Sequence, residues 1–197
     1  MSAELTQAKA ELRSALKREC RSHSPEEWER ASATTRARLT ERPEWRQARS
    51  VLLYVALPGE IDLGPLATVA LGEGRQLALP RFREQSRDYE AAWVVDLERD
   101  LAPGRYGILE PVARCPGAAL NQLDLALVPG VGFAPNGRRL GRGKGFYDRL
   151  LVNVRGIRCG VAADWQIVPS IPRLPHDELI DCIVTPGGWI ECHKLPV

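Results

Sequence analysis

Short apolar runs separated by helix-forming segments are the feature that most limits how this chain can fold. Five such runs follow one another: VLLYVA (51–56), QLALP (76–80), LDLALVP (123–129), IRCGVAA (157–163) and LIDCIVT (179–185). Runs of this length and character are typical of buried strands. Strands that alternate with helices predict an α/β fold with three layers, in which helices flank a largely parallel sheet.

The segments between these runs complete the predicted layout. LGPLATVALGEG (63–74) predicts a short helix that ends at glycines, and YEAAWVVDL (89–97) is a candidate for a further strand. The stretch 101–117 is rich in proline and glycine, which favours a loop. WIEC (189–192) follows the turn TPGG and is expected to return as an edge strand or hairpin partner.

Two helices are predicted before the first strand. Apolar residues recur at helical spacing from Leu5 to Leu16, with a basic stripe that includes Lys9 and Arg13 beside them. Ser24 and Glu27 form a capping-box pattern with Pro25 at the first helical position, which indicates the start of a second helix. We expect Pro43 to close that helix.

Composition places the chain among ordinary globular proteins. Its 197 residues are 44% hydrophobic and 26% charged, which predicts one domain over 1–197. The net charge is only +2, so no overall field favours nucleic acid or membrane. The charged start lacks a secretory signal, and the five cysteines show no paired spacing. We therefore expect a cytoplasmic protein with reduced thiols, and a monomer by default.

A glycine-rich basic stretch, GRRLGRGKGFYDRL (137–150), follows the strand 123–129 and precedes a helix predicted to start near Lys144. Ligands of open α/β sheets bind at such a place, and a helix amino terminus attracts anions. Gly141, Gly143 and Gly145 leave the backbone open to a phosphate, and Arg142 adds charge. The stretch predicts an anion site, with a solvated basic turn as the alternative.

Common phosphate-loop patterns do not describe this stretch. A Walker loop requires Ser or Thr after GK, and a dinucleotide fingerprint would have glycine in place of Phe146. Asp148 falls in the first helical turn, where a carboxylate stabilises the helix dipole or, beside bound phosphates, holds magnesium.

The stretch VPGVGFAPNGRRLGRGKGFYDRLL (128–151) closely resembles the glycine-rich signature of 5-formyltetrahydrofolate cyclo-ligases, also called methenyltetrahydrofolate synthetases. The resemblance extends, in order, over nearly the whole chain. Its other motifs are KAELR (9–13), YVALPGEID (54–62), LPRFRE (79–84), YGILEP (106–111) and DWQIVPSIPRLPHDELIDCIVT (164–185).

The resemblance implies an enzyme that binds Mg²⁺ and uses ATP as a co-substrate. It would convert 5-formyltetrahydrofolate, as the monoglutamate or polyglutamylated, into 5,10-methenyltetrahydrofolate, ADP and phosphate. The formyl oxygen would be phosphorylated, and N10 of the folate would attack the activated carbon. Such an enzyme has to hold two ligands in line and neutralise the phosphoryl group.

The resemblance also assigns roles to residues. Arg142 and Lys144 would be the catalytic cations, and Asp148 and Asp177 the metal ligands. The ATP-binding positions would be Lys9, Arg13, Arg139, Leu140, Gly141, Arg142, Gly143, Lys144, Gly145, Phe146, Tyr147 and Gln166. The folate-binding positions would be Val55, Glu60, Phe82, Tyr106, Arg142, Gly143, Lys144, Gly145 and Phe146. His176 is expected to be a loop or surface residue.

Two departures from the family pattern and two competing functions stay open at this point. Ala134 stands where many relatives have aspartate, and Phe146 replaces the more usual tyrosine. A catalytically silent homologue could hold nucleotide or folate without turnover. An RNA-binding protein could use RRLGRGK as a basic patch, although the balanced charge and the lack of an RRM or KH signature argue against it.

Overall fold

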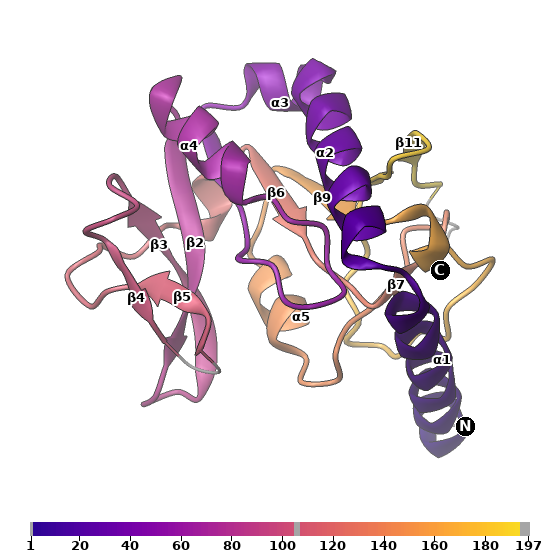
Figure 1. The fold of residues 1–197 in the computed structure, drawn as a ribbon. Helices are drawn as coiled ribbons and strands as arrows, with labels where there is room; N and C mark the ends of the chain where they lie inside the picture. The colour runs from indigo at the N-terminus through magenta and orange to yellow at the C-terminus, as the bar shows by residue number, and fades with distance from the viewer. Residues whose placement is uncertain (1, 105–106, 194–197) are drawn as a thin grey trace.

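The computed structural model describes residues 2–104 and 107–193, and a seven-stranded sheet forms its centre (Figure 1). The strand order is β11-β10-β9-β6-β1-β2-β3, in which β10, β9, β6, β1 and β2 are parallel and the edge strands β3 and β11 are antiparallel. The strands are β1 (Ser50–Leu52), β2 (Gln76–Arg83), β3 (Asp88–Val94), β6 (Leu125–Val128), β9 (Ile157–Val161), β10 (Cys182–Val184) and β11 (Trp189–Glu191).

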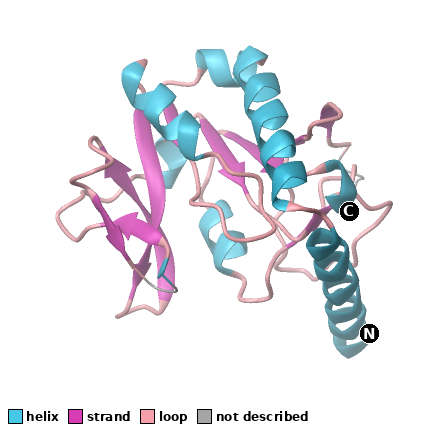
Figure 2. Ribbon diagram, in the orientation of Figure 1, coloured by secondary structure: helices cyan, strands magenta, loops and turns pink. Residues whose placement is uncertain are grey.

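Helices cover both faces of this sheet, which confirms the three-layer α/β prediction (Figure 2). The helices of the described residues are α1 (Ser2–Ser22), α2 (Pro25–Glu41), α3 (Pro43–Gln47), α4 (Gly64–Gly72) and α5 (Phe146–Leu151), with 3-10 turns η2 (Leu120–Gln122) and η3 (Asp164–Gln166). Apolar side chains of α2, α3 and α4 share a core with one sheet face, and those of α5 pack on the other. None of the helices in the described residues is both long and apolar enough to cross a membrane.

Strand alternation explains the two cores. Successive side chains of a strand point to opposite faces, so Val51 lies in the core under α2–α4 whereas Leu52 lies in the core with α5. Both are fully buried. The predicted strands are apolar on both faces because both faces are covered.

The start of β1 is fastened to the start of β6 by one carboxylate. Asp124 Oδ2 accepts hydrogen bonds from the backbone N–H groups of Arg49 and Ser50, at 2.8 and 2.9 Å, and from Ser50 Oγ at 3.0 Å. Burial would raise the pKa of Asp124, but these hydrogen bonds outweigh it and lower the pKa. The contact holds the parallel pair in register at its amino end.

The two N-terminal helices form as predicted. Ser24 caps α2: its Oγ accepts from Glu27 N at 3.3 Å, and Glu27 Oε2 accepts from Ser24 N at 2.7 Å. Helix α1 lies apart from the main cores and packs Leu16 into a small cluster with Val131, Leu140 and Ile171. Helix α1 therefore contributes to this small cluster and not to the two large cores.

Some predicted boundaries were wrong. Helix α2 does end before Pro43, as predicted, but Pro43 also opens the short helix α3, because proline suits a first helical position. The 101–117 stretch holds a hairpin, β4 (Leu101–Pro103) with β5 (Leu109–Pro111), and the glycine-rich stretch holds another, β7 (Gly132–Phe133) with β8 (Arg139–Leu140). Strands this short carry almost no periodic signal.

Other strands differ in length from the prediction. Strand β1 ends at Leu52, and the rest of VLLYVA leaves the sheet toward the cavity described below. Strand β2 continues past Pro80 to Arg83, which it can do because β1 pairs with β2 only as far as Ala78.

We expect Gly156→Ala to lower the free energy of unfolding by about 1–3 kcal/mol. A Cβ at Gly156 would collide with the carbonyl oxygens of Leu123 and Asp124, and backbone atoms cannot move aside as a side-chain tip can. Urea unfolding followed by circular dichroism measures the effect. Gly72→Ala is the matched control, since nothing lies within 4 Å of its added Cβ; equal stability of the two variants would contradict the prediction.

Candidate active site

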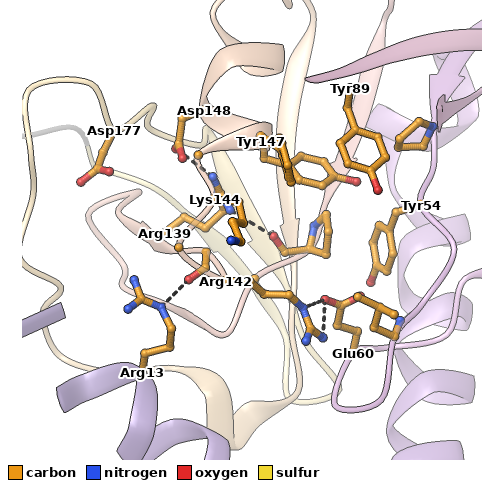
Figure 3. Close-up of a pocket in the computed structure, with 18 of the residues that line it drawn as sticks. Arg13, Tyr54, Glu60, Tyr89, Arg139, Arg142, Lys144, Tyr147, Asp148 and Asp177 are labelled. Atoms are coloured by element: carbon orange, nitrogen blue, oxygen red, sulfur yellow. Dashed lines mark hydrogen bonds and ion pairs between the residues drawn. The ribbon is translucent and has the colours of Figure 1, made fainter. Parts of the chain in front are cut away.

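A cavity of about 590 Å³ lies where β1 and β6 end, at the carboxyl edge of the parallel strands (Figure 3). It is lined by α1, by the segment after β1, by the β5 hairpin, by the glycine-rich loop and by the segment before β10. Segments far apart in sequence thus meet at one place, and the volume suits a ligand of small-molecule size.

The glycine-rich loop bends sharply before α5. Gly143 and Gly145 have φ values of 98° and 66°, in the left-handed region that disfavours other residues. Because Gly145 is left-handed, α5 starts at Phe146, two residues later than expected, and has only six residues. The glycines are therefore needed for the path of the loop itself.

Arginine and lysine side chains form three ion pairs with carboxylates of the cavity, two of them in its polar half. Arg139 Nη2 lies 2.8 Å from Asp148 Oδ1, and Lys9 Nζ lies 2.7 and 2.5 Å from the two oxygens of Asp177. The Arg139 side chain is only 3% exposed and that of Lys9 9%. A buried charge needs a partner of this kind. The third pair joins Arg142 to Glu60 at 2.9 Å.

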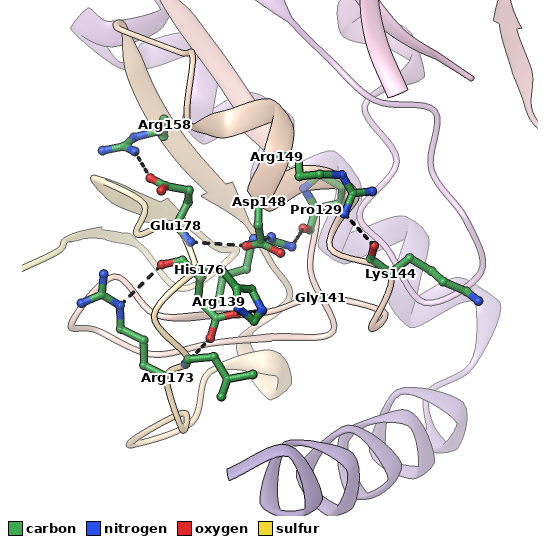
Figure 4. Close-up of polar contacts among 12 residues, drawn as sticks. Pro129, Arg139, Gly141, Lys144, Asp148, Arg149, Arg158, Arg173, His176 and Glu178 are labelled. Atoms are coloured by element: carbon green, nitrogen blue, oxygen red, sulfur yellow. Dashed lines mark hydrogen bonds and ion pairs between the residues drawn. The ribbon is translucent and has the colours of Figure 1, made fainter. Parts of the chain in front are cut away.

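Further polar contacts extend from this group. Arg13 Nε donates to the carbonyl oxygen of Gly141 at 2.8 Å, which ties α1 to the loop. Glu178 N donates to Asp148 Oδ1 at 3.4 Å, and the Glu178 carboxylate contacts Arg158 (Figure 4). Lys144 is exposed, its side chain points away from this cluster, and it has no ion-pair partner in the part of the chain that the structure describes.

Aromatic rings line the other half of the cavity. The Tyr89 ring centroid lies 4.9 Å from that of Phe146, in an edge-on arrangement. The Arg139 guanidinium carbon lies 5.7 Å from the centroid of the Tyr147 ring. Burial raises the pKa of the Tyr147 phenol, and the Glu60 carboxylate raises that pKa further. The Tyr54 hydroxyl donates to Ile61 O at 2.8 Å, so its ring is fixed. Such a wall suits a flat ligand.

Glu60 is the buried acid on this side. Its side chain is 7% exposed, Oε1 accepts from Arg142, and Oε2 accepts from Leu57 N at 3.0 Å. Burial raises the pKa of Glu60, and Arg142 and the Leu57 hydrogen bond only partly offset this.

Most residues selected from the sequence lie on the cavity. They are Lys9, Arg13, Val55, Glu60, Arg139, Gly141, Arg142, Gly143, Lys144, Gly145, Phe146, Tyr147, Asp148 and Asp177. Tyr106 falls outside the described residues.

Three selected residues are not part of the lining. Leu140 is fully buried against α1, and Phe82 lies behind Tyr89 and Phe146 with its ring edge-on to both. Gln166 is 1% exposed; its amide donates to the carbonyl oxygen of Gly130 at 3.0 Å and accepts from Ala163 N at 2.9 Å. The roles expected for these residues would have to be indirect.

The sequence missed several lining residues. They include Tyr54, Pro80, Tyr89, Glu110, Pro129 and Leu174. Tyr54 could have been found, because it begins the motif YVALPGEID that also carries Val55 and Glu60. Glu110 could not, because the hairpin that carries it was interpreted as loop. His176, expected at the surface, also lines the cavity, although 70% of its side chain is exposed.

The two positions at which the chain departs from the family pattern can also be located in the structure. Ala134 is fully buried in the cluster under α1 and does not line the cavity. Phe146 lines it and keeps its ring against Tyr89. The first departure therefore concerns packing, and the second concerns only a hydroxyl at the cavity wall.

The donor set suits a cation shared with a ligand. Within residues 2–104 and 107–193, no three His, Cys, Asp or Glu side chains gather into a metal site. Asp148 and Asp177 nevertheless both line the cavity. Mg²⁺ is usually held by one or two carboxylates together with phosphate oxygens, so two carboxylates fit it without a protein cage.

Comparison with known proteins decides the family. The model of the 5-formyltetrahydrofolate cyclo-ligase family matches residues 5–186. The chain belongs to the 5-formyltetrahydrofolate cyclo-ligase family.

Individual relatives agree over most of their length. The probable 5-formyltetrahydrofolate cyclo-ligase of Caenorhabditis elegans is 29% identical, covering 94% of this chain and 96% of the relative. The 5-formyltetrahydrofolate cyclo-ligase of Escherichia coli K12 is also 29% identical, covering 85% and 94%. The NMR structure of Aquifex aeolicus 5,10-methenyltetrahydrofolate synthetase matches with a TM-score of 0.85 and 33% identity, covering 96% of this chain and 95% of that one.

We expect Glu60→Gln to gain stability relative to the wild type as pH rises. Because the folded-state pKa of Glu60 is raised, its contribution to stability is complete below an unfolded pKa of about 4.3 and is lost as pH rises through the folded pKa. Urea unfolding of both proteins between pH 4 and pH 8 measures the difference. The exposed Glu41→Gln serves as control, and a pH-independent difference for Glu60→Gln would refute the prediction.

Proposed function

We propose that the chain catalyses the conversion of 5-formyltetrahydrofolate to 5,10-methenyltetrahydrofolate, with ATP cleaved to ADP and phosphate and with Mg²⁺ required. Family membership supports the reaction class. The observation that carries the proposal is that one loop, 139–147, borders both a cationic region and an aromatic region of one cavity. A reaction between a polyanion and a flat heterocycle requires this adjacency.

In the proposed arrangement the nucleotide occupies the side of α1. Lys9, Arg13 and Arg139 would hold its phosphates, since all three line that part of the cavity. Asp148 and Asp177 would hold Mg²⁺, which supplies positive charge to phosphate oxygens when bound. The two acids would then exchange their present partners, Arg139 and Lys9, for the ion.

The folate would occupy the aromatic side. Tyr54, Tyr89 and Phe146 offer ring faces and edges, and Val55 adds apolar contact. Glu60 would accept hydrogen bonds from the amino and ring N–H groups of the pterin, as a carboxylate suits a pair of donors. The formyl group would then face the loop.

Arg142 and Lys144 have the catalytic role in this proposal. The formyl oxygen attacks the γ-phosphorus of ATP, the bond to the β-phosphate oxygen breaks, and ADP leaves. N10 then attacks the formyl carbon, the phosphate departs with the bonding electrons, and N10 loses its proton. The two cations would neutralise the phosphoryl group while it moves, and no covalent enzyme intermediate is needed.

The assay of the proposed function is direct. Purified protein given ATP, Mg²⁺ and 5-formyltetrahydrofolate should form methenyltetrahydrofolate, followed by its absorbance, with one ADP per product. Chelation of Mg²⁺ should stop the reaction. Binding of both ligands with no product would instead identify a silent homologue.

We expect Lys144→Met to lower kcat by about 10²–10³-fold, the loss typical of removing one charge-stabilising group. Thermal stability should be unchanged, because Lys144 is exposed and has no ion-pair partner among the described residues. Steady-state kinetics and a melting curve test both parts. Lys17→Met, exposed on α1 and away from the cavity lining, should keep full activity. A Lys144→Met enzyme with wild-type kcat would rule out the catalytic role.

A further inference from the structure

Among the described residues, arginine and lysine side chains form three ion pairs in the cavity, and one of these pairs joins its two halves. Arg139–Asp148 and Lys9–Asp177 each connect two groups of the proposed nucleotide side. Arg142–Glu60 connects the glycine-rich loop to the segment after β1 across the cavity, as Figure 3 shows. This pair is therefore placed where the occupation of one half can affect the other.

In the Glu60–Arg142 pair, each side chain occupies the polar atoms of the other that a bound ligand would use. The Arg142 guanidinium contacts Glu60 Oε1 at 2.9 Å through Nε and Nη2, and Nη2 also approaches the carbonyl oxygen of Pro58 at 3.3 Å. Glu60 Oε2 already accepts from Leu57 N. While the pair holds, Glu60 has one oxygen committed to Arg142, and Arg142 has its charged fork turned away from the nucleotide.

The burial of the two partners is unequal. The Glu60 side chain is 7% exposed, whereas that of Arg142 is 41% exposed. A buried carboxylate that loses its hydrogen-bond donor carries a large desolvation penalty, whereas an exposed arginine side chain on a glycine-flanked loop can change its rotamer. A ligand that brings its own N–H donors to Glu60 can therefore replace Arg142 without leaving the acid unpaired.

We propose that the Glu60–Arg142 pair couples the two substrate sites. Folate donors bound at Glu60 release Arg142, which then joins the phosphates of the nucleotide; nucleotide phosphates that attract Arg142 free Glu60 for the folate. Glu60 thus acts as a positioning residue for Arg142, beyond its own contact with the pterin. This inference rests on the proposed function.

Coupling of this kind is reciprocal and has a measurable size. If folate raises the affinity for nucleotide by some factor, nucleotide must raise the affinity for folate by the same factor. Couplings between sites are typically about 5–150-fold. We expect at least about fivefold here, since one ion pair of two strongly bonding groups is exchanged.

Calorimetry with a non-hydrolysable ligand tests the coupling without turnover. The Kd of magnesium adenylyl imidodiphosphate is measured with and without saturating 5-formyltetrahydrofolate, and the Kd of the folate with and without the analogue. Equal Kd values under both conditions would overturn the coupling while leaving the proposed function intact. Absence of binding by either ligand alone or together would overturn both.

Two variants make the test specific. Each removes one partner of the ion pair and should strengthen binding of the ligand that the remaining partner contacts. Glu60→Gln should lower the Kd of the nucleotide analogue measured without folate, toward the value of the folate-saturated wild type. Arg142→Gln should lower the Kd of folate measured without nucleotide. Weaker or unchanged binding in either titration would contradict the proposal, since simple loss of a contact or damage to the fold gives that result.

A control variant removes a similar ion pair elsewhere. Arg149 Nε lies 2.6 Å from Asp88 Oδ2, and neither residue lines the cavity. Asp88→Asn should leave both Kd values and their mutual dependence as in the wild type. Loss of coupling in this variant would mean that the effect is not a property of the Glu60–Arg142 pair. Melting curves of all three variants show whether each one is folded.

Discussion

The parallel pairing of β1 with β6 is the interaction on which the site depends. Asp124 fixes the amino ends of these two strands to each other, and the ladder brings their carboxyl ends out side by side. The segment with Tyr54 and Glu60 leaves one strand, and the glycine-rich loop leaves the other. A shift of register here would separate the aromatic wall from the cations, whatever the quality of the individual residues.

Three carboxylates that line the cavity are neutralised by neighbouring cations. Each of the carboxylates Glu60, Asp148 and Asp177 is held by one arginine or lysine. Buried or half-buried groups could not remain unpaired without a large desolvation penalty. Under the proposed function, ligands would therefore exchange partners with these three ion pairs, so that the carboxylates stay paired both before and after binding.

Much of this could be predicted from the sequence. Apolar runs gave the sheet and its layers because burial on both faces leaves a strong signal, and Ser24 with Glu27 marked a helix start because capping is local. The loop from Arg139 to Tyr147 was found because its composition is unusual, and the family resemblance selected Lys9 and Asp177.

Contacts over long sequence separations could not be predicted. Nothing local in the sequence shows that Lys9 meets Asp177 or that Arg142 meets Glu60, because these contacts follow from chain topology. The contacts of Gln166 could not be predicted either. Its motif suggested a ligand contact, but its amide is hydrogen-bonded to the backbone at Gly130 and Ala163. The hairpin that carries Glu110 was missed because strands of three residues have no clear period.

The six-residue length of α5 affects how the cavity responds to ionic strength. A helix so short contributes little macrodipole, so attraction for phosphates must come mainly from side-chain charges. Those charges fall into two groups: Arg142 and Lys144 face solvent, whereas Lys9 and Arg139 are almost enclosed. At physiological salt, with a Debye length of about 8 Å, mobile ions screen the first group far more than the second. Under the proposed function, salt would therefore weaken the capture of an anion at the mouth of the cavity much more than its retention inside.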